Sequence, residues 1–184
     1  MNLETRRQIF HALFGILIVL SLYFDILGLT FFAIFFLLAV LLSYIYKKRK
    51  IRIIKLFLDK FEREGAFPGQ GMITFILSTL LCLLLFDKNV ALASLMILAL
   101  GDSFTHLGKF GRIKHPFNEK KYLEGVILGI LAGWVGASFF VNPLTAFLGS
   151  FFAMIFESFD IVVFDRRLDD NITVPLVAGV VMSL

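Results

Sequence analysis

The chain has 184 residues, 59% of them hydrophobic, and a formal net charge of +4. Soluble domains are usually about 45–50% apolar, so the composition argues against an ordinary soluble domain and indicates an integral membrane protein. The single cysteine, Cys82, excludes an internal disulfide bond, and no nucleic acid polymer is expected as a partner.

The apolar residues fall into long blocks with few charges, which are typical of membrane-spanning helices. The blocks cover residues 9–24, 26–46, 72–86, 89–106, 123–141, 143–163 and 172–184. The first block is not followed by a small-residue cleavage site, so we expect it to be retained as a span. The sequence therefore predicts an all-α, polytopic transmembrane helical bundle of about seven spans, each needing about 20 residues, in a single domain, 1–184.

Basic residues predict the orientation of this bundle, because Lys and Arg are retained on the cytoplasmic side. Among the 18 Lys and Arg residues, only Lys88 falls in a segment that a seven-span arrangement places outside. We therefore expect a cytoplasmic N-terminus, a basic cytoplasmic loop at residues 107–122, and motif residues that face the cytoplasm. The membrane would be a cell membrane or an ER-type membrane.

Two further segments have predicted packing roles. Residues 47–64 combine apolar residues at helical spacing with many charges, which indicates an amphipathic helix in the cytoplasmic interface. Its basic cluster suits a topology anchor or, alternatively, steering of lipid or nucleotide. Gly125, Gly129 and Gly133 are spaced four apart, so they predict a face on which another helix packs closely.

Polar residues at the ends of the blocks are candidates for chemistry, because a charged group inside a bilayer is costly. Glu4, Arg7 and His11 share one face of a helix; the alternative is an anchor with one ion pair. A second group combines an acid with a loop rich in glycine and lysine, which suits the binding of phosphate oxygens. The alternative is a flexible loop whose acid only caps a helix. Its residues are Gly101, Asp102, Ser103, Gly108, Lys109 and Gly111.

Two more groups lie later in the chain. Lys121, Glu124 and Gly125 follow a cationic loop, and the first two could form only a local pair. The last group is rich in carboxylates, which suit Mg²⁺, although an acid before the seventh block could merely cap a helix. Its residues are Glu157 and Asp160, inside the sixth block, and Asp169, Asp170 and Asn171, before the seventh. All four groups fall on one membrane face in the predicted topology, which suggests a phosphate-bearing soluble substrate that meets a lipid.

In this order, the motifs resemble those of the dolichol kinase, phytol kinase and CTP-dependent diacylglycerol kinase family of membrane enzymes. The resemblance covers nearly the whole chain, and the Gly-Asp and Asp-Asp-Asn motifs are its specific parts. Gln8 and Tyr122 stand where the family commonly has Lys and Ser. The matching segments are Glu4 to His11, Pro68 to Gly71, Gly101 to Gly111, Lys121 to Gly125, Glu157, and Asp169 to Pro175.

The resemblance implies a CTP-dependent kinase that uses Mg²⁺ to transfer the γ-phosphate to the hydroxyl of a membrane lipid alcohol. The acceptor would be a polyprenol or dolichol, phytol or geranylgeraniol, or diacylglycerol. It further implies that the metal and the triphosphate are bound by Asp102, Asp169, Asp170 and Asn171, and that Asp102 takes part in catalysis. The phosphates would be contacted by Arg7, Lys109 and Lys121, in a nucleotide site that also includes Gly101, Ser103, Gly108, Gly111, Glu124 and Gly125. The proton acceptor would be His11, Glu157 or Asp160.

The sequence is also compatible with two other functions. A CTP:phospholipid cytidylyltransferase also needs acids, Mg²⁺ and a membrane, but its long signature motif is not found in the sequence. A non-enzymatic membrane transporter would favour acids at mid-membrane depth and inverted repeats, whereas the acids of this chain lie mainly at one end of the predicted spans. The lipid, the preference for CTP over ATP, and a homodimer as the assembly are left undecided.

Overall fold

The computed structural model describes residues 3–49, 67–106, 111–116, 118–159, 162–163 and 166–184. The chain is all-α, as predicted, with two very short antiparallel hairpins. Its helices are α1 (Leu3–Tyr23), α2 (Leu29–Lys48), α4 (Gln70–Leu85), α5 (Lys88–Met96), the π-helix η1 (Ile97–Asp102), α6 (Ser103–Thr105), α7 (Leu123–Ala137), α8 (Pro143–Ser158) and α9 (Asp170–Met182). The hairpins are β1 (Lys114–His115) with β2 (Asn118–Tyr122), and β3 (Val162–Val163) with β4 (Arg166–Arg167).

A helix lies in each of the predicted apolar blocks, but the helices differ in length. Within the described ranges, α1 and α2 are the two helices that are long and apolar enough to cross a bilayer. The helices α4, α7, α8 and α9 have 13 to 16 residues, fewer than the roughly 20 that a straight span needs. Helix length therefore supports two candidate spans, and the seven-span arrangement is not established by it.

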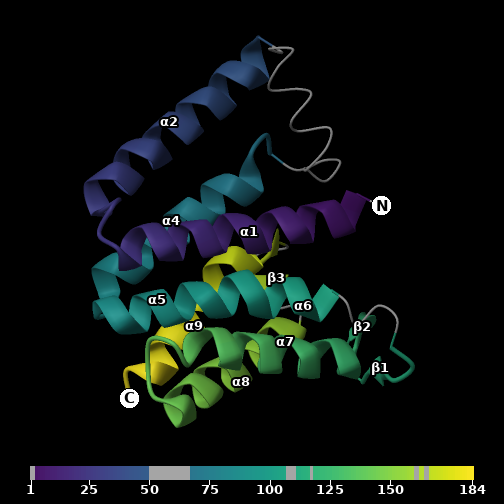
Figure 1. The fold of residues 1–184 in the computed structure, drawn as a ribbon. Coiled ribbons are helices and arrows are strands. Elements are labelled where there is room, and N and C mark those ends of the chain that lie inside the picture. The colour runs from purple at the N-terminus through teal and green to yellow at the C-terminus, as the bar shows by residue number, and fades with distance from the viewer. Residues whose placement is uncertain (1–2, 50–66, 107–110, 117, 160–161, 164–165) are drawn as a thin grey trace.

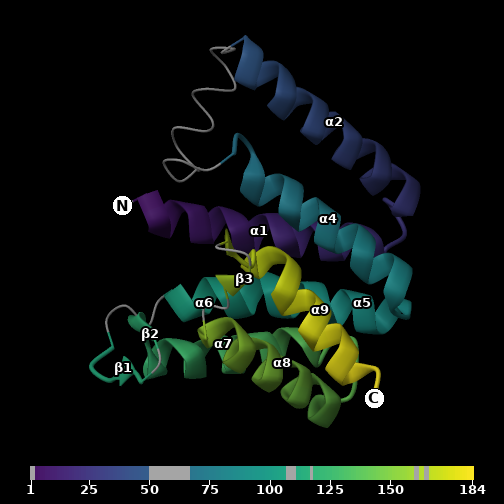
Figure 2. The same ribbon diagram turned by 180° about the vertical axis from the view of Figure 1, so that it is seen from behind.

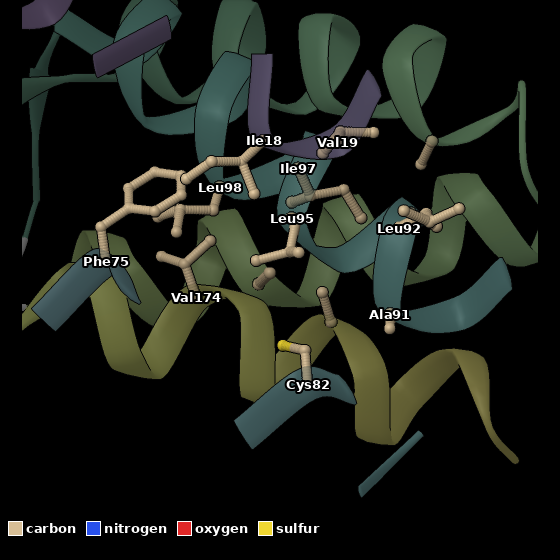
Figure 3. Packing of buried hydrophobic residues seen from close by; sticks show 14 of the residues in the cluster. Ile18, Val19, Phe75, Cys82, Ala91, Leu92, Leu95, Ile97, Leu98 and Val174 are labelled. Atoms are coloured by element: carbon tan, nitrogen blue, oxygen red, sulfur yellow. The ribbon is translucent and has the colours of Figure 1, made fainter. Parts of the chain in front are cut away.

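The centre of the bundle is the helical path formed by α5, η1 and α6. The backbone at Ile97 and at Ser103 is right-handed helical, so the path continues from Lys88 to Thr105 without a break. It packs against α1, α7 and α9, and most of its apolar side chains are buried, with the exception of the exposed Phe104 in α6. Figure 3 shows Leu92, Leu95 and Leu98 from this path surrounded by side chains of α1, α4 and α9.

The glycines of α7 form the predicted packing face. A Cβ atom added at Gly129 would lie 2.8 Å from the carbonyl oxygen of Gly101, and one at Gly133 would lie 2.5 Å from Oγ of Ser150. These distances leave no room for a side chain, so η1 and α8 approach α7 at backbone distance. The prediction of a close packing face on α7 is confirmed.

The helices alternate in direction, so that one end of the bundle collects most of the candidate residues. At this polar end α1, α4, α7 and α9 begin, and α2, α6 and α8 end (Figures 1 and 2). The far end holds the α1–α2 and α4–α5 connections, which are joined by an ion pair of 2.5 Å between Lys88 Nζ and Asp25 Oδ1. Distant polar motifs are therefore brought to the same end of the molecule.

The helix α2 is less enclosed than the others. It packs against α4 and leans away from the rest of the bundle (Figures 1 and 2), so most of its apolar side chains are exposed. The predicted amphipathic helix at 47–64 lies outside the described residues, except for the last residues of α2 and Arg49.

Candidate functional site

Three carboxylates converge at the polar end of the bundle. Asp102 is the last residue of η1, Glu157 lies in the last turn of α8, and Asp170 is the first residue of α9. One oxygen atom from each lies within 4.8 Å of the other two. These three side chains, called the carboxylate cluster below, come from three helices that are separate in sequence.

Burial makes the negative charge of this cluster costly. Glu157 is 5% exposed, and Asp102 and Asp170 are half-buried. Asp170 precedes the apolar segment 172–184. Burial, together with the nearby charges of Asp102 and Glu157, raises the pKa of Asp170 to about 7. A set of carboxylate oxygens at this spacing fits a hard divalent cation such as Mg²⁺, which prefers oxygen ligands.

Lys121 supplies a positive charge at the edge of the cluster. Its Nζ atom donates hydrogen bonds to the carboxylate of Glu157 and, at 2.6 Å, to the main-chain oxygen of Glu157. Asn118 on the same strand donates from Nδ2 to the main-chain oxygen of Ser158 at 3.2 Å. The β1–β2 hairpin is therefore attached to the C-terminal end of α8 by two side chains.

Glu124 belongs to the attachment of this hairpin. Its Oε1 atom accepts hydrogen bonds from the main-chain N–H groups of Arg112, at 2.8 Å, and Ile113, at 3.1 Å. The N–H of Leu123 also donates to the oxygen of Ile113 at 2.9 Å. The carboxylate of Glu124 thus ties the entry of the hairpin to the first turn of α7.

The N-terminal motif, residues Glu4 to His11, also approaches Asp102. The Nε2 atom of His11 is 3.7 Å from Oδ2 of Asp102, and the His11 ring meets the ring of Phe75 edge-on at 5.0 Å. Glu4 and Arg7 form an ion pair of 2.8 Å within α1, and Glu4 also lies 4.0 Å from Nδ1 of His106. The residues of this motif therefore surround the end of η1 and α6.

The start of α9 is joined to the start of α4. Asp169 caps α9 by accepting a hydrogen bond from the N–H of Asn171 at 3.1 Å, and it accepts another from Nε2 of Gln70 at 3.2 Å. The side-chain nitrogen of Asn171 donates to Oγ1 of Thr74 at 2.9 Å and faces the oxygen of Gly71 at 3.4 Å. Both residues thus connect two helices beside the carboxylate cluster.

The segment from Pro68 to Gly71, called the Pro-Gly motif below, contains a turn with a backbone conformation that glycine adopts readily. Gly69 has a φ of 77° and precedes the first residue of α4. The oxygen of Pro68 accepts a hydrogen bond from Ser43, which also ties the end of α2 to this turn. The motif therefore directs α4 toward the start of α9.

Two glycines of the predicted nucleotide motifs have packing roles. A Cβ atom at Gly101 would lie 2.8 Å from the sulfur of Met154, and the oxygen of Gly101 accepts a hydrogen bond from Thr105 at 2.9 Å. Gly125 is buried in the first turn of α7. Ser103 is buried as well, and its Oγ atom donates to the main-chain oxygen of Gln8 at 3.1 Å. These contacts align the end of η1 with α1, α7 and α8.

The structure brings together Asp102, Glu157, Asp170 and Lys121, and His11 lies next to Asp102. Asp169, Asn171 and Glu124 lie nearby, but their described hydrogen bonds go to other protein groups. Arg7 is paired with Glu4, and Gly111 precedes the hairpin. Gly108, Lys109 and Asp160 lie outside the described residues.

Sequence reasoning gave Gln70 no role of its own in this region, and it did not identify Thr74. Gln70 lies inside the Pro-Gly motif, and Thr74 follows it by one helical turn, so the two residues share a face of α4. That spacing is a signal that could have identified them. Glu157 was expected as a proton acceptor, and the geometry adds it to the candidate cation ligands.

Comparison with known proteins finds a similarity over nearly the whole chain. The chain is similar to the uncharacterized protein MJ1137 of Methanocaldococcus jannaschii, with 29% identity over 183 residues. The aligned region covers 98% of this chain and 93% of that protein. No protein-family model and no solved structure matches the chain. The similarity to MJ1137 therefore extends over nearly the whole chain, and the chemistry must be argued from the residues themselves.

Proposed function

We propose that this chain is a metal-dependent kinase that transfers the γ-phosphate of a nucleoside triphosphate to the hydroxyl of a membrane lipid alcohol. The observation that carries the proposal is the carboxylate cluster with Lys121 beside it, at one end of a bundle that begins with two apolar helices of span length. The sequence resemblance favours CTP as the donor and a polyprenol or dolichol, phytol or geranylgeraniol, or diacylglycerol as the acceptor.

The membrane arrangement is part of this proposal. The seven apolar segments would all cross the bilayer, with the polar end of the bundle at the cytoplasmic surface. The alternating helix directions support this arrangement, and so does the scarcity of basic residues at the far end, where Lys88 is the one Lys or Arg of the described connections. A soluble nucleotide and the hydroxyl of a lipid could then meet at the same end of the helices.

In the proposed reaction, the acceptor oxygen forms a bond to the γ-phosphorus while the bond from that phosphorus to the β–γ bridging oxygen breaks. The nucleoside diphosphate leaves, and the hydroxyl proton passes to a protein base or to water. Mg²⁺ held by Asp102, Glu157 and Asp170 would neutralise the phosphate oxygens during this transfer. Lys121 and Arg7 would bind phosphate oxygens, and Asn171 and Asp169 would keep the start of α9 in position.

The experiment uses purified full-length protein in lipid nanodiscs, Mg²⁺, γ-labelled CTP or ATP, and a panel of polyprenol, phytol, geranylgeraniol and diacylglycerol. We expect label in one lipid class and release of a nucleoside diphosphate. Glu157→Gln should lower the rate by about 100-fold or more, because it removes charge that a phosphoryl-transfer site needs. The matched control is Asp87→Asn, the same chemical change at the exposed far end.

Several outcomes would contradict the proposal. Label in none of the lipids, or a Glu157→Gln variant that is as active as the wild type, would reject the kinase assignment. Release of pyrophosphate with CMP in the lipid would identify a cytidylyltransferase instead. Thermal unfolding of both variants serves as the control for folding.

A further inference from the structure

The Lys121–Glu157 pair occupies an unusual position for a structural ion pair. The carboxylate of Glu157 accepts a hydrogen bond from Lys121 while it belongs to the carboxylate cluster. The two residues are largely buried: of the side-chain surface alone, 16% is exposed in Lys121 and 3% in Glu157. The charge of Lys121 also acts on Asp170. Its ammonium group therefore neutralises part of the cluster to which a cation would bind.

We propose that Lys121 is a displaceable counterion that couples cation binding to nucleotide binding. Without a cation, Lys121 neutralises Glu157; when a cation binds with a triphosphate, Lys121 leaves the Glu157 carboxylate and binds a phosphate oxygen. This inference rests on the proposed function, because it needs a cation at the carboxylate cluster and a phosphate donor beside it.

The surroundings of Lys121 allow its side chain to move while its backbone stays in place. Asn118 and Glu124 hold the hairpin through groups other than the Lys121 ammonium. The main-chain N–H of Leu123, two residues after Lys121, donates a hydrogen bond to the main-chain oxygen of Ile113. The stem of a lysine side chain has four flexible bonds, so rotation about them moves the ammonium without moving the strand.

Competition for Glu157 gives a coupling between two ligands. A cation that binds alone competes with the positive charge of the Lys121 ammonium for the Glu157 carboxylate, and an ammonium that it displaces loses this acceptor. A cation that binds with a triphosphate brings new acceptor oxygens for the same ammonium. The nucleotide should therefore raise the affinity for the cation, and by linkage the cation should raise the affinity for the nucleotide.

The test measures Mn²⁺ binding to the full-length protein in nanodiscs, by the electron paramagnetic resonance signal of free Mn²⁺, with and without β,γ-methylene CTP. Lys121→Met should bind Mn²⁺ alone about tenfold more tightly than the wild type, because a charged hydrogen bond no longer competes. In this variant the analogue should raise Mn²⁺ affinity much less than it does in the wild type. Lys114→Met is the matched control, since Lys114 is an exposed lysine of the same hairpin, and it should behave as the wild type.

A second variant separates this role from a structural one. Lys121→Gln loses the charge but keeps a donor for the main-chain oxygen of Glu157, so it should also bind Mn²⁺ more tightly than the wild type. It takes the place of Lys121→Met if that variant fails to fold. If wild type binds Mn²⁺ and neither Lys121 variant binds it more tightly, the counterion role is wrong. If none of the proteins binds Mn²⁺, with or without the analogue, the cation site of the proposed function is wrong instead.

Discussion

The side chains of Asn171 and Thr74 form a hydrogen bond between residues that are 97 positions apart in the sequence. This bond joins the first turn of α9, which carries Asp170, to the first turns of α4. Ser78, one turn further along α4, donates to the main-chain oxygen of Asn171 as well. The position of one carboxylate in the cluster therefore depends on hydrogen bonds made by residues that carry no charge.

Thr74→Val tests this dependence at the level of one residue. Valine has nearly the shape of threonine but removes the Oγ1 atom that accepts the hydrogen bond from Asn171. We expect a loss of about 1 kcal/mol in the free energy of unfolding, the usual contribution of one hydrogen bond, and a lower affinity for the cation. The measurements are unfolding in mixed detergent micelles and Mn²⁺ binding; Thr30→Val, at an exposed position of α2, should leave both unchanged.

Single-residue chemistry was partly predictable from the sequence. Asp102, Glu157 and Asp170 were all identified as candidates, because acids beside apolar blocks are costly unless they have a function or a partner. The sequence could not predict that Glu157 approaches Asp102 and Asp170 while Asn171 is bonded to α4. That distinction depends on how each helix is rotated about its axis and on the residue at which it ends. A sequence pattern locates helix ends only to within about 2–4 residues, which is too coarse to decide it.

At the level of elements, the π-helix η1 determines where Asp102 lies. A π-turn widens the helix and changes the direction of the residues that follow it. In this chain, Gly101 meets Gly129 of α7 on one side and Met154 of α8 on another, so the end of η1 is held between two helices. The segment 97–102 has a sequence that reads as an ordinary apolar helix, and nothing in it predicted a π-turn.

Gly129→Ala tests this contact. The added Cβ atom would lie 2.2 Å from Oγ1 of Thr105 and 2.8 Å from the oxygen of Gly101, so η1 and α7 must separate. We expect a destabilisation of about 1–3 kcal/mol and weaker cation binding, since Asp102 would move. The same measurements on Gly28→Ala, where an added Cβ atom meets no atom within 4 Å, provide the control; equal stability of the two variants would show that the contact is not tight.

The hairpin was missed by sequence reasoning for a different reason. Residues 107–122 were expected as a basic cytoplasmic loop, because their charge follows the topology rule. In the structure, the strands pair Lys114 with Tyr122 and His115 with Asn118. Buried contacts from His115 and Asn118 to the end of α8 hold the hairpin. Such contacts join distant segments and leave no periodic pattern in the sequence.

For the whole molecule, the alternating helix directions predict that residues at the two ends of the bundle face opposite sides of a membrane. Lys114→Cys places a thiol in the hairpin at the polar end, and Asn89→Cys places one at the far end, both at exposed positions. Cys82 is buried, so it should contribute little background.

We expect a membrane-impermeant maleimide to label Asn89→Cys in intact cells and Lys114→Cys only after the membrane is opened. The matched comparison is each variant after solubilisation, when both thiols should react. Labelling of both positions from the same side of an intact membrane would contradict the seven-segment arrangement, while the all-α fold would stand.

In the proposed seven-segment arrangement, the short length of α7 and α8 has a consequence for the surrounding lipid. With 15 and 16 residues and a rise of about 1.5 Å per residue, each helix is about 22–24 Å long, whereas the hydrocarbon layer is about 30 Å thick. A bilayer that matches these helices must be indented around them. In the proposed arrangement, such a local depression would bring headgroups, water and dissolved nucleotides down to the depth of Glu157, and thicker membranes should then lower the rate of the proposed phosphoryl transfer.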